Sequence, residues 1–314
     1  MAENTVKKIA TRESYGNSLK ELAEEFPNLV VLDADLAAGT KTGIFRKAYP
    51  DRHIDCGIAE ENMMGVAAGL SLVGKIPFVS SFAMFAAGRA FEQVRNSIGY
   101  PHLNVKIGAT HAGITVGEDG ATHQCNEDIA LMRTIPGMVV MCPSDDVEAR
   151  AAVRAALEYE GPVYIRFGRA AVPVINDHPG YHFEIGKGTV VREGKDVTIV
   201  ATGICVDSAL GAAKMLEEEG ISAEVVNICT IKPLDEEIIL NSAKKTGKVV
   251  TVEEHSVIGG LGSAVCDCLC AHYPVPVKKV GMQDVFGESG SAAALVEKYG
   301  LDAKGVYKSV KEFL

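Results

Sequence analysis

Apolar residues in this chain follow two alternating patterns, and the alternation predicts the fold. Short uninterrupted apolar runs are typical of strands buried on both faces of a sheet. Strand-like runs of this kind lie at residues 29–33, 76–80, 103–107, 137–141 and 162–169, and residues 53–58 form a further extended piece. Between them, apolar residues recur every three or four positions, as on one face of a helix, at residues 12–26, 59–73 and 145–159 and from about 126 onward. Strands that alternate with helices predict an α/β fold with a doubly wound parallel sheet.

A break in this pattern divides the chain. Residues 170–188 contain Pro173, Pro179 and Gly180 and show neither period, which is typical of a linker. The α/β pattern then resumes, with strands predicted at 196–201, 223–228, 248–253 and 277–280 and helices at 208–219, 235–245, 261–272 and 303–313. We therefore predict a first domain at 1–172, a linker at 173–188 and a smaller α/β domain at 189–314.

Composition narrows the class of protein. Of 314 residues, 47% are hydrophobic and 23% are charged, which suffices for two globular cores. The net charge of -10 argues against nucleic acid as a partner. No apolar run reaches membrane-spanning length, and the start of the chain is polar, so we expect neither a membrane anchor nor a leader. The eight cysteines then indicate free thiols in a reducing cytoplasm.

The segment at residues 108–124, called the central loop below, concentrates candidate chemistry. It follows a predicted strand and precedes a predicted helix, which is where ligands bind in open α/β sheets. Four glycines let its backbone bend closely around a ligand. His111 and His123 flank Glu118 and Asp119, so groups that transfer protons and groups that bind hydroxyls share one segment. A polar surface loop that happens to hold two histidines is the alternative.

Other candidates lie at the ends of predicted strands and helices. Glu60 begins a predicted helix, where a carboxylate also complements the helix dipole without any catalytic role. Phe82 and Phe85 are three residues apart, so on a helix they would share a face, either in the core or beside an aromatic ligand. Arg166 and Arg169 end a strand and suit a phosphate or carboxylate, although a surface salt bridge explains them equally well.

A possible metal site is the remaining cysteine pattern. Cys266, Cys268 and Cys270 occupy alternate positions of a predicted helix. Alternate helical positions do not face each other, so at most Cys266 and Cys270 share a side. We therefore predict no metal site in this chain.

Taken together, the motifs resemble the transketolase family of thiamine-diphosphate enzymes over essentially the whole chain. The resemblance lies in their order more than in any single one. They are Ala-Thr-Arg-Glu-Ser at 10–14, Asp-Ala-Asp-Leu at 33–36, Gly-Ile-Ala-Glu-Glu-Asn-Met at 57–63, Ser-Phe-Ala-Met-Phe at 81–85, Thr-His at 110–111, Gly-Glu-Asp-Gly-Ala-Thr-His-Gln at 117–124, Pro-Gly at 136–137 and Glu-Glu-His-Ser-Val-Ile-Gly-Gly-Leu-Gly at 253–262. The resemblance implies a pyrimidine-binding domain followed by the C-terminal domain.

The resemblance covers only the C-terminal part of full-length family members. Those enzymes hold the diphosphate and its metal with an N-terminal domain that bears Gly-Asp-Gly, and this chain contains no Gly-Asp-Gly. The resemblance thus implies a split enzyme in which a partner N-terminal subunit holds most of the diphosphate and a Mg²⁺ or Ca²⁺ ion. A heterotetramer of two such chains and two partners is the symmetric expectation.

The resemblance also implies a role for individual cofactor-site residues. Glu60 matches the glutamate that hydrogen-bonds the aminopyrimidine ring and favours the tautomer that activates the cofactor. Phe82 and Phe85 match the aromatic wall against that ring, and Asp35 is expected at the same site.

Substrate contacts follow from the same resemblance. His123 is expected to transfer protons and Asp119 to bind hydroxyls of the donor sugar. His111, Arg12 and Arg169 match the sugar-phosphate anchors, with Arg166 as a nearby substitute for Arg169. One departure is that Ala-Ala-Gly-Thr-Lys at 37–41 stands where many transketolases have a phosphate-binding serine.

The implied activity is transfer of a two-carbon ketol unit from a ketose phosphate, such as xylulose 5-phosphate, to an aldose phosphate. Alternatives are a β-type subunit of a 2-oxoacid dehydrogenase, a deoxyxylulose-phosphate synthase-like subunit and a non-catalytic scaffold subunit. The dehydrogenase subunits typically end the central loop in His-Ser-Gln rather than the Thr-His-Gln at 122–124. The presence of Glu60, Asp119 and His123 together argues against a scaffold.

Overall fold

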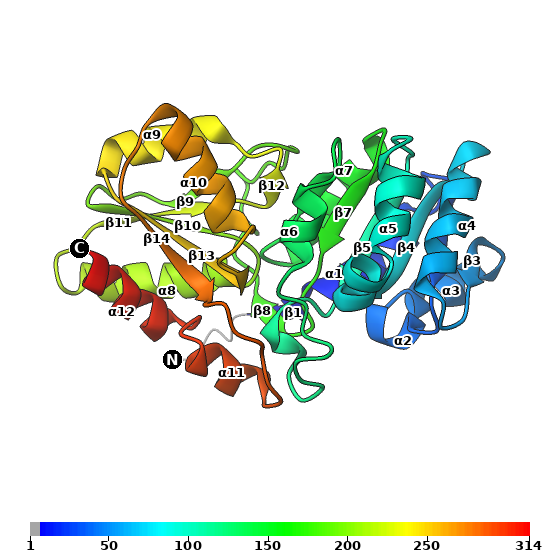
Figure 1. Ribbon diagram of the computed structural model, residues 1–314, viewed down its shortest axis with the longest axis horizontal. Coiled ribbons are helices and arrows are strands. Elements are labelled where there is room, and N and C mark those ends of the chain that lie inside the picture. Colours follow the sequence, from blue (N-terminus) through cyan, green and yellow to red (C-terminus); the bar gives the residue numbers. More distant parts are fainter. Residues whose placement is uncertain (1–6) are drawn as a thin grey trace.

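A computed structural model describes residues 7–314, so the first six residues of the predicted first domain lie outside the described part. The described chain forms two α/β lobes that lie side by side (Figure 1). The strands are β1 Lys8–Ala10, β2 Leu29–Asp33, β3 His53–Asp55, β4 Ile76–Phe82, β5 Lys106–Thr110, β6 Val139–Met141, β7 Val163–Arg166, β8 Ala171–Pro173, β9 Thr189–Arg192, β10 Val197–Ala201, β11 Ala223–Asn227, β12 Thr230–Lys232, β13 Val249–Ser256 and β14 Val277–Met282. The predicted two-domain α/β fold is confirmed.

Helices connect most of these strands. The α-helices are α1 Thr11–Leu22, α2 Ala37–Thr40, α3 Gly43–Ala48, α4 Glu60–Leu72, α5 Phe91–Gln93, α6 Asp128–Arg133, α7 Asp146–Glu158, α8 Cys205–Glu217, α9 Glu236–Thr246, α10 Leu261–His272, α11 Ala292–Lys298 and α12 Ala303–Phe313. Wider π-turns, η2 Met84–Arg89 and η3 Val94–Gly99, flank α5, and short 3-10 turns form η1 Pro50–Arg52 and η4 Ile114–Val116.

The first lobe is built on a seven-stranded sheet in the order β12-β6-β7-β5-β4-β2-β3. All its pairings are parallel except that of β12 with β6. Strand β3 lies on one side of β2 and β4 on the other, so the direction of strand addition reverses at β2. In an open α/β sheet, such a switch point leaves a crevice at the carboxyl ends of the strands, where ligands bind.

Helices cover both faces of this sheet, which explains the uninterrupted apolar runs. On one face Leu19 of α1, Phe45 of α3 and Ala152 of α7 belong to a fully buried cluster. On the other face, Met63 of α4 and Ile129 of α6 belong to a second cluster that continues into the C-terminal lobe. Because strands buried on both faces need apolar side chains at every position, alternation is absent from their sequences.

The second lobe contains a five-stranded sheet in the order β14-β13-β10-β11-β9, with only β9 antiparallel to its neighbour. A third cluster packs α8 and α12 against this sheet through residues such as Val206 and Val306. In Figure 1, α9 and α10 lie on the opposite side of the sheet from α8 and α12. The lobe therefore has helices on both faces, like the first one.

Contacts between the lobes were not predicted. Strand β12 follows the C-terminal lobe's β11 in the chain but pairs with β6 of the first sheet. The segment predicted as a linker begins with the last residue of β8, which pairs with β1. Two residues further on, the N–H groups of Ile175 and Asn176 each donate to Asp145 Oδ2 at 2.7 Å. The division at residues 172 and 189 stays a prediction, since the structure ties the two lobes together through paired strands and a shared core.

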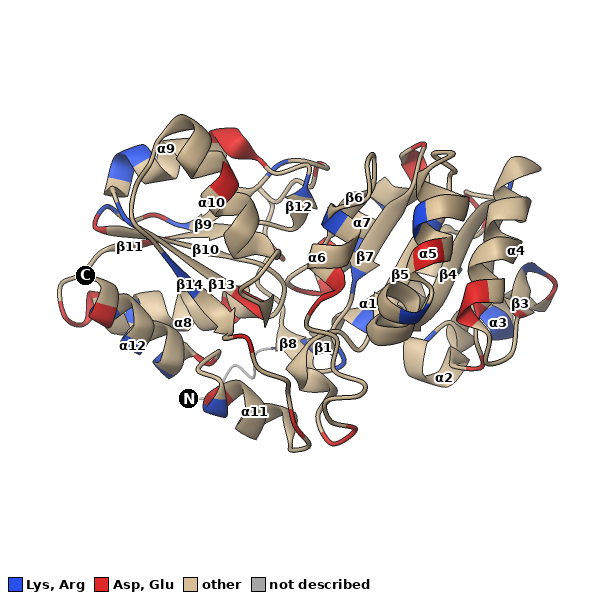
Figure 2. Ribbon diagram, in the orientation of Figure 1, with Lys and Arg blue, Asp and Glu red and all other residues tan. Residues whose placement is uncertain are grey.

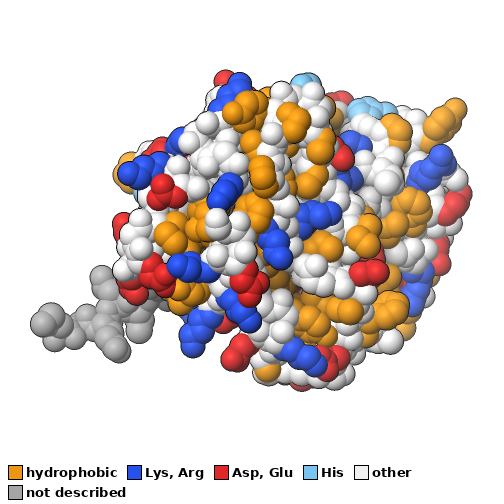
Figure 3. Space-filling view, turned by 60° about the vertical axis from the view of Figure 1, so that its left-hand side comes forward, with side chains coloured by type: hydrophobic (Ala, Val, Ile, Leu, Met, Phe, Trp, Pro, Cys, Tyr) orange, Lys and Arg blue, Asp and Glu red, His pale blue; other side chains and the backbone are white. Residues whose placement is uncertain are grey.

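Charge is spread over both lobes. Basic and acidic residues are interspersed along the helices and loops (Figure 2). In a view that brings the C-terminal lobe forward, apolar surface patches are separated by charged side chains (Figure 3). No helix within residues 7–314 is long and apolar enough to cross a membrane.

Candidate active site

Several of the predicted site residues converge at the carboxyl ends of β2, β4 and β5, on the switch-point crevice. Phe82 is the last residue of β4, and His111 directly follows β5. Arg12 comes from the start of α1 and contacts His111 directly. Side chains separated by up to 99 positions in sequence are thus brought together. The parallel topology causes this, because it gathers the ends of several strands at one edge.

Glu60 is the first residue of α4 and is only 1% exposed. Its Oε2 accepts a hydrogen bond from Arg89 Nη1 at 2.9 Å, and its Oε1 accepts one from Ser81 Oγ at 3.4 Å. Complementation of the helix dipole alone does not require burial, since an exposed carboxylate serves equally well. The burial and the two side-chain partners therefore indicate a specific role. Neither Ser81 nor Arg89 was predicted as a partner, because no spacing rule connects them with Glu60.

Phe82 and Phe85 lie together, although not on a helix as predicted. Phe82 ends β4 and Phe85 belongs to the π-turn η2, so the helical expectation is wrong for this pair. Their rings are nearly parallel, with centroids 6.1 Å apart and an interplanar angle of 16°. The Arg89 guanidinium lies 4.6 Å from the Phe85 centroid. Glu60, Ser81, Phe82, Phe85 and Arg89 are called the Glu60 cluster below.

His111 is buried and held as a neutral ring. Arg12 Nη1 donates to its Nε2 at 3.1 Å, so Nδ1 must carry the proton, and it lies 2.9 Å from Thr110 Oγ1. Burial, followed by the nearby charges of Arg12 and Arg169 and by His123, lowers the pKa of His111 to about 3. The ring also stacks on Phe82 with centroids 3.8 Å apart.

Two arginines place positive charge beside His111. Arg12 also donates to the backbone carbonyl of Gly39 at 2.9 Å, and burial together with Arg169 lowers the pKa of its guanidinium. Arg169 remains 38% exposed, donates to the carbonyl of Val116 and lies 3.1 Å from a carboxylate oxygen of Glu118. The positive charges of the two guanidinium groups repel each other. An anion bound between them would relieve this repulsion, so the region favours anion binding.

His123 approaches the aromatic rings from the other end of the central loop. Its ring meets Phe85 edge-on at 5.4 Å between centroids, and its Nδ1 lies 2.9 Å from Thr122 Oγ1. Asp119 is exposed in the same loop. His111 and His123 therefore contact adjacent aromatic rings, Phe82 and Phe85, which joins the central loop to the Glu60 cluster.

Arg166, expected as a substitute for Arg169 at the phosphate, does not lie in this group. Its side chain is only 4% exposed, and its Nε lies 2.9 Å from Asp128 Oδ2. Its Nη2 donates to the carbonyls of Glu254 at 2.7 Å and Cys125 at 3.3 Å. A guanidinium whose donors are used inside the protein is not available to a ligand. Sequence position alone could not separate Arg166 from Arg169, which lies three residues later.

The segment after β2 contains the other predicted residues. Asp35 is exposed, has a positive φ of 60° and donates its N–H to Asp55 Oδ1 at 3.1 Å. Thr40, in the segment that stands where many transketolases have a phosphate-binding serine, is buried, and its hydroxyl hydrogen-bonds with the carbonyl of Leu36 at 3.0 Å and with Thr42 Oγ1 at 2.9 Å. Thr40 is therefore engaged within its own turn.

Metal-ligating side chains do not cluster in the described part of the chain. Within residues 7–314, no three His, Cys, Asp or Glu side chains gather as a metal ion would require. Cys266 and Cys270 of α10 have free thiols, as do the other cysteines.

Comparisons with known proteins agree with the fold and the motifs. The family model for the transketolase pyrimidine binding domain matches residues 7–174, and the model for the transketolase C-terminal domain matches residues 186–306. A putative transketolase C-terminal section from Methanocaldococcus jannaschii is 52% identical, over 96% of this chain and 95% of the relative. A 6-deoxy-6-sulfo-D-fructose transketolase subunit from Clostridium sp. (strain MSTE9) is 49% identical, over 96% and 93%.

A solved structure shows the same arrangement. It is described as a split gene transketolase, inactive beta4 tetramer, and it is 59% identical to this chain with a TM-score of 0.89, over 98% of each chain. Two family models, close relatives over nearly their full length and a matching fold agree. The chain belongs to the transketolase family and carries its pyrimidine-binding and C-terminal domains.

Proposed function

We propose that this chain is one subunit of a split transketolase that transfers a two-carbon ketol unit between sugar phosphates. The observation that carries the proposal is the Glu60 cluster: a buried carboxylate at a helix start, beside two nearly parallel phenylalanine rings. A flat heterocycle with a ring nitrogen matches both parts, because the rings offer stacking surface and the carboxyl group offers a hydrogen bond.

The residues present fit the aminopyrimidine of thiamine diphosphate. Glu60 would hold the ring nitrogen, while Phe82 and Phe85 would flank the ring. Asp35, at the same end of the sheet, is proposed as a further contact. When bound, thiamine diphosphate supplies the electron sink that ketol transfer requires. The chain's own part is to hold a carboxyl group at the ring nitrogen and to keep water away from it with the aromatic side chains.

The central loop and its neighbours are proposed to bind the sugar phosphate. Arg12 and Arg169 supply positive charge, and His111 supplies a ring whose protonation state does not change near neutral pH because its pKa is about 3. His123, which contacts Phe85, is proposed to transfer protons at the reacting end of the sugar. Asp119, exposed in the loop, is proposed to accept hydrogen bonds from donor hydroxyls.

A partner chain is part of the proposal. The sequence contains no Gly-Asp-Gly, so the diphosphate and a Mg²⁺ or Ca²⁺ ion are assigned to an N-terminal transketolase subunit. The relative named as a C-terminal section and the structure described as a split gene transketolase support this division. Two copies of each chain would form the heterotetramer.

The donor sugar is the least constrained element. Xylulose 5-phosphate as donor and ribose 5-phosphate as acceptor are proposed first, because a phosphate fits the two arginines. One relative is named for 6-deoxy-6-sulfo-D-fructose, whose sulfonate is also an anionic end group. The hydroxyl of Thr40 is engaged within its own turn, so the segment at 37–41 offers no replacement for the family's serine through this residue, and either anionic group is proposed to bind the two arginines.

The test mixes this chain with a partner that bears Gly-Asp-Gly, in the presence of thiamine diphosphate and Mg²⁺. Ketol transfer from xylulose 5-phosphate to ribose 5-phosphate in the mixture, with neither chain active alone, is the expected result. A mixture that transfers only from a sulfonated ketose would keep the reaction and change the donor. Full activity from this chain alone would contradict the split-enzyme proposal.

A further inference from the structure

Beyond the residues that face the site, we propose that Glu254 of the C-terminal lobe is a positioning residue that fixes the shape of the central loop for substrate binding. The expected change in donor KM rests on the proposed function, whereas the expected change in the conformation of the loop does not. Glu254 lies on β13 and is 139 residues away in sequence from its partner in the loop. Its carboxylate contacts the loop through the Thr115 N–H, and its Oε2 also lies 4.0 Å from Nη1 of the buried Arg166.

The contact between Glu254 and the loop is short and buried. Glu254 is 3% exposed, and its Oε1 accepts a hydrogen bond from the N–H of Thr115 at 2.7 Å. Gly113 packs so closely on this carboxylate that a Cβ atom there would lie 2.3 Å from Glu254 Cδ. Gly113 also has a φ of +75°. Two features therefore favour glycine at position 113: its backbone has a positive φ, and the carboxylate of Glu254 leaves no room for a side chain.

Thr115 lies between the two ends of the loop that carry chemistry. On one side is His111, whose ring stacks on Phe82, and on the other are the exposed Asp119 and then His123. The base of the loop is closed by the N–H of Gly113, which donates to the carbonyl of Cys125 at 2.8 Å. Because the Glu254 carboxylate holds the Thr115 N–H, it fixes the backbone path of the residues that follow His111.

A second attachment holds the far part of the loop. Gln124 Nε2 donates to the carbonyls of Ile114, Gly117 and Glu288 at 3.3, 3.3 and 2.9 Å. Because Glu288 belongs to the C-terminal lobe, this attachment also crosses between the lobes. It acts on the His123 side, however, so the contact to Glu254 is expected to govern mainly the His111 side of the loop.

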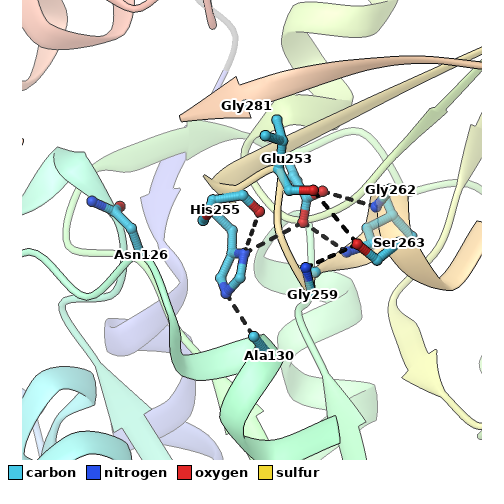
Figure 4. Close-up of polar contacts among 12 residues, drawn as sticks. Asn126, Ala130, Glu253, His255, Gly259, Gly262, Ser263 and Gly281 are labelled. Carbon is cyan, nitrogen blue, oxygen red and sulfur yellow. Dashed lines mark hydrogen bonds and ion pairs between the residues drawn. The ribbon is translucent and has the colours of Figure 1, made fainter. Parts of the chain in front are cut away.

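The residues on either side of Glu254 in β13 contact other parts of the protein, so among these three residues the contact with the central loop belongs to Glu254. Glu253 accepts hydrogen bonds at 2.7 and 2.8 Å from the backbone N–H groups of the first two residues of α10, as Figure 4 shows in part. His255 Nε2 accepts the N–H of Ala130 at 3.3 Å (Figure 4). Successive strand residues alternate between faces, so only the middle one of the three reaches the central loop.

The structural test measures amide hydrogen exchange of the full chain. Glu254→Ala removes the acceptor of the Thr115 N–H and is expected to speed exchange in residues 112–118. Glu254→Gln keeps an acceptor oxygen and is expected to restore protection in large part. Glu253→Gln is the matched control: it alters an equally buried carboxylate on the same strand and is expected to leave exchange in residues 112–118 unchanged.

The kinetic test uses the complex reconstituted with the partner subunit. Loss of a buried hydrogen bond to a charged group corresponds to a change of about ten- to a hundredfold. We expect Glu254→Ala to raise the KM for the ketose phosphate donor by about that factor, with kcat reduced less than about threefold and the Glu253→Gln control close to wild type.

Two results would overturn the proposal. One is unchanged loop exchange in Glu254→Ala. The other is a loss of activity in Glu254→Ala and Glu253→Gln that is equal and follows their melting temperatures. If the wild-type complex transfers no ketol unit while Glu254→Ala still loosens the loop, the proposed function fails and the positioning role stands.

Discussion

The Glu60 cluster and the central loop adjoin one another, yet they are held in different ways. The cluster belongs wholly to the first lobe, at the end of β4 and the start of α4, where regular elements fix the backbone. The central loop is held by side chains, and two of its attachments, from Glu254 and from the Glu288 carbonyl, come from the C-terminal lobe. In the proposed function, cofactor activation would therefore depend on regular elements of one lobe, and substrate recognition on a loop that both lobes hold.

The two regions also differ in charge. The cluster holds one buried carboxylate with an arginine beside it, whereas the loop region places Arg12 and Arg169 near a neutral His111, with the exposed Glu118 paired to Arg169. A carboxyl group suits a ring nitrogen, and paired guanidinium groups suit an anion. This difference predicts that variants of the cluster affect the chemical step and cofactor binding, whereas variants of the loop affect the donor and the stability of the lobe contact.

Glu60→Gln is expected to have the largest effect on activity. The amide keeps the size of the side chain but cannot hold or release a proton at the ring nitrogen. Proton-transfer groups contribute about 10²- to 10⁴-fold to rate, so kcat of the reconstituted complex is expected to fall by that order.

Glu61→Gln provides the control for this experiment. Glu61 is the next residue of the same helical turn and is exposed, so its substitution is expected to leave kcat unchanged. Equal rates for Glu60→Gln and wild type would remove Glu60 from the mechanism and revive a scaffold role for the chain.

Arg166→Met is expected to have the next largest effect, on stability. It leaves Asp128 buried without its cation and breaks the bond to the Glu254 carbonyl. Removing one partner of a buried ion pair costs about 3–5 kcal/mol. Urea unfolding is expected to show this loss, and Arg154→Met is the control, since its pair with Glu25 is exposed and such pairs contribute about 1 kcal/mol or less. Similar losses of unfolding free energy in both variants would show that the buried pair stabilises the fold no more than the exposed pair does.

Most of the Glu60 cluster was predictable from sequence, and much of the loop's support was not. The positions of Glu60, Phe82 and Phe85 follow from a strand end and a helix start, which hydrophobic patterns locate. The partner Arg89 and the distant Glu254 are defined only by tertiary contacts, and nothing in their local sequence marks them. Likewise, Arg166 and Arg169 look alike in the sequence, and burial alone separates them.

Short elements were missed for a related reason. β12 has three residues, and its pairing with β6 joins a segment of the second lobe to the sheet of the first. Three residues are too few to show a period of two, so the pattern could not reveal a strand. The lobes are consequently more closely joined than a chain divided at a proline-rich linker suggests.

Phe85→Leu is expected to have a moderate effect on cofactor binding. Leucine keeps apolar volume but loses the flat ring that stacks near Phe82 and lies under the Arg89 guanidinium. Aromatic pairs contribute about 0.5–1.5 kcal/mol beyond their buried area, so the thiamine diphosphate concentration for half-maximal activity is expected to rise about three- to tenfold. Phe91→Leu, in the neighbouring helix α5, serves as the control. Unchanged cofactor dependence in Phe85→Leu would place the ring outside the cofactor site.

The smallest effect concerns pH and His111. The pKa of this histidine is lowered from 6.5 to about 3 in the folded chain, so below pH 6.5 the unfolded chain binds a proton that the folded chain does not. Stability from this group is therefore complete above about pH 6.5 and is lost as the pH falls toward 3. Between pH 7 and pH 6 the expected loss is about 0.7 kcal/mol.

His111→Asn cannot titrate, so its unfolding free energy is expected to fall less over this interval than that of wild type, whereas His178→Asn, at an exposed histidine, is expected to follow wild type. Parallel pH curves for His111→Asn and wild type would show that His111 has the same pKa in the folded and the unfolded chain, and the lowered pKa of the folded chain would then be wrong.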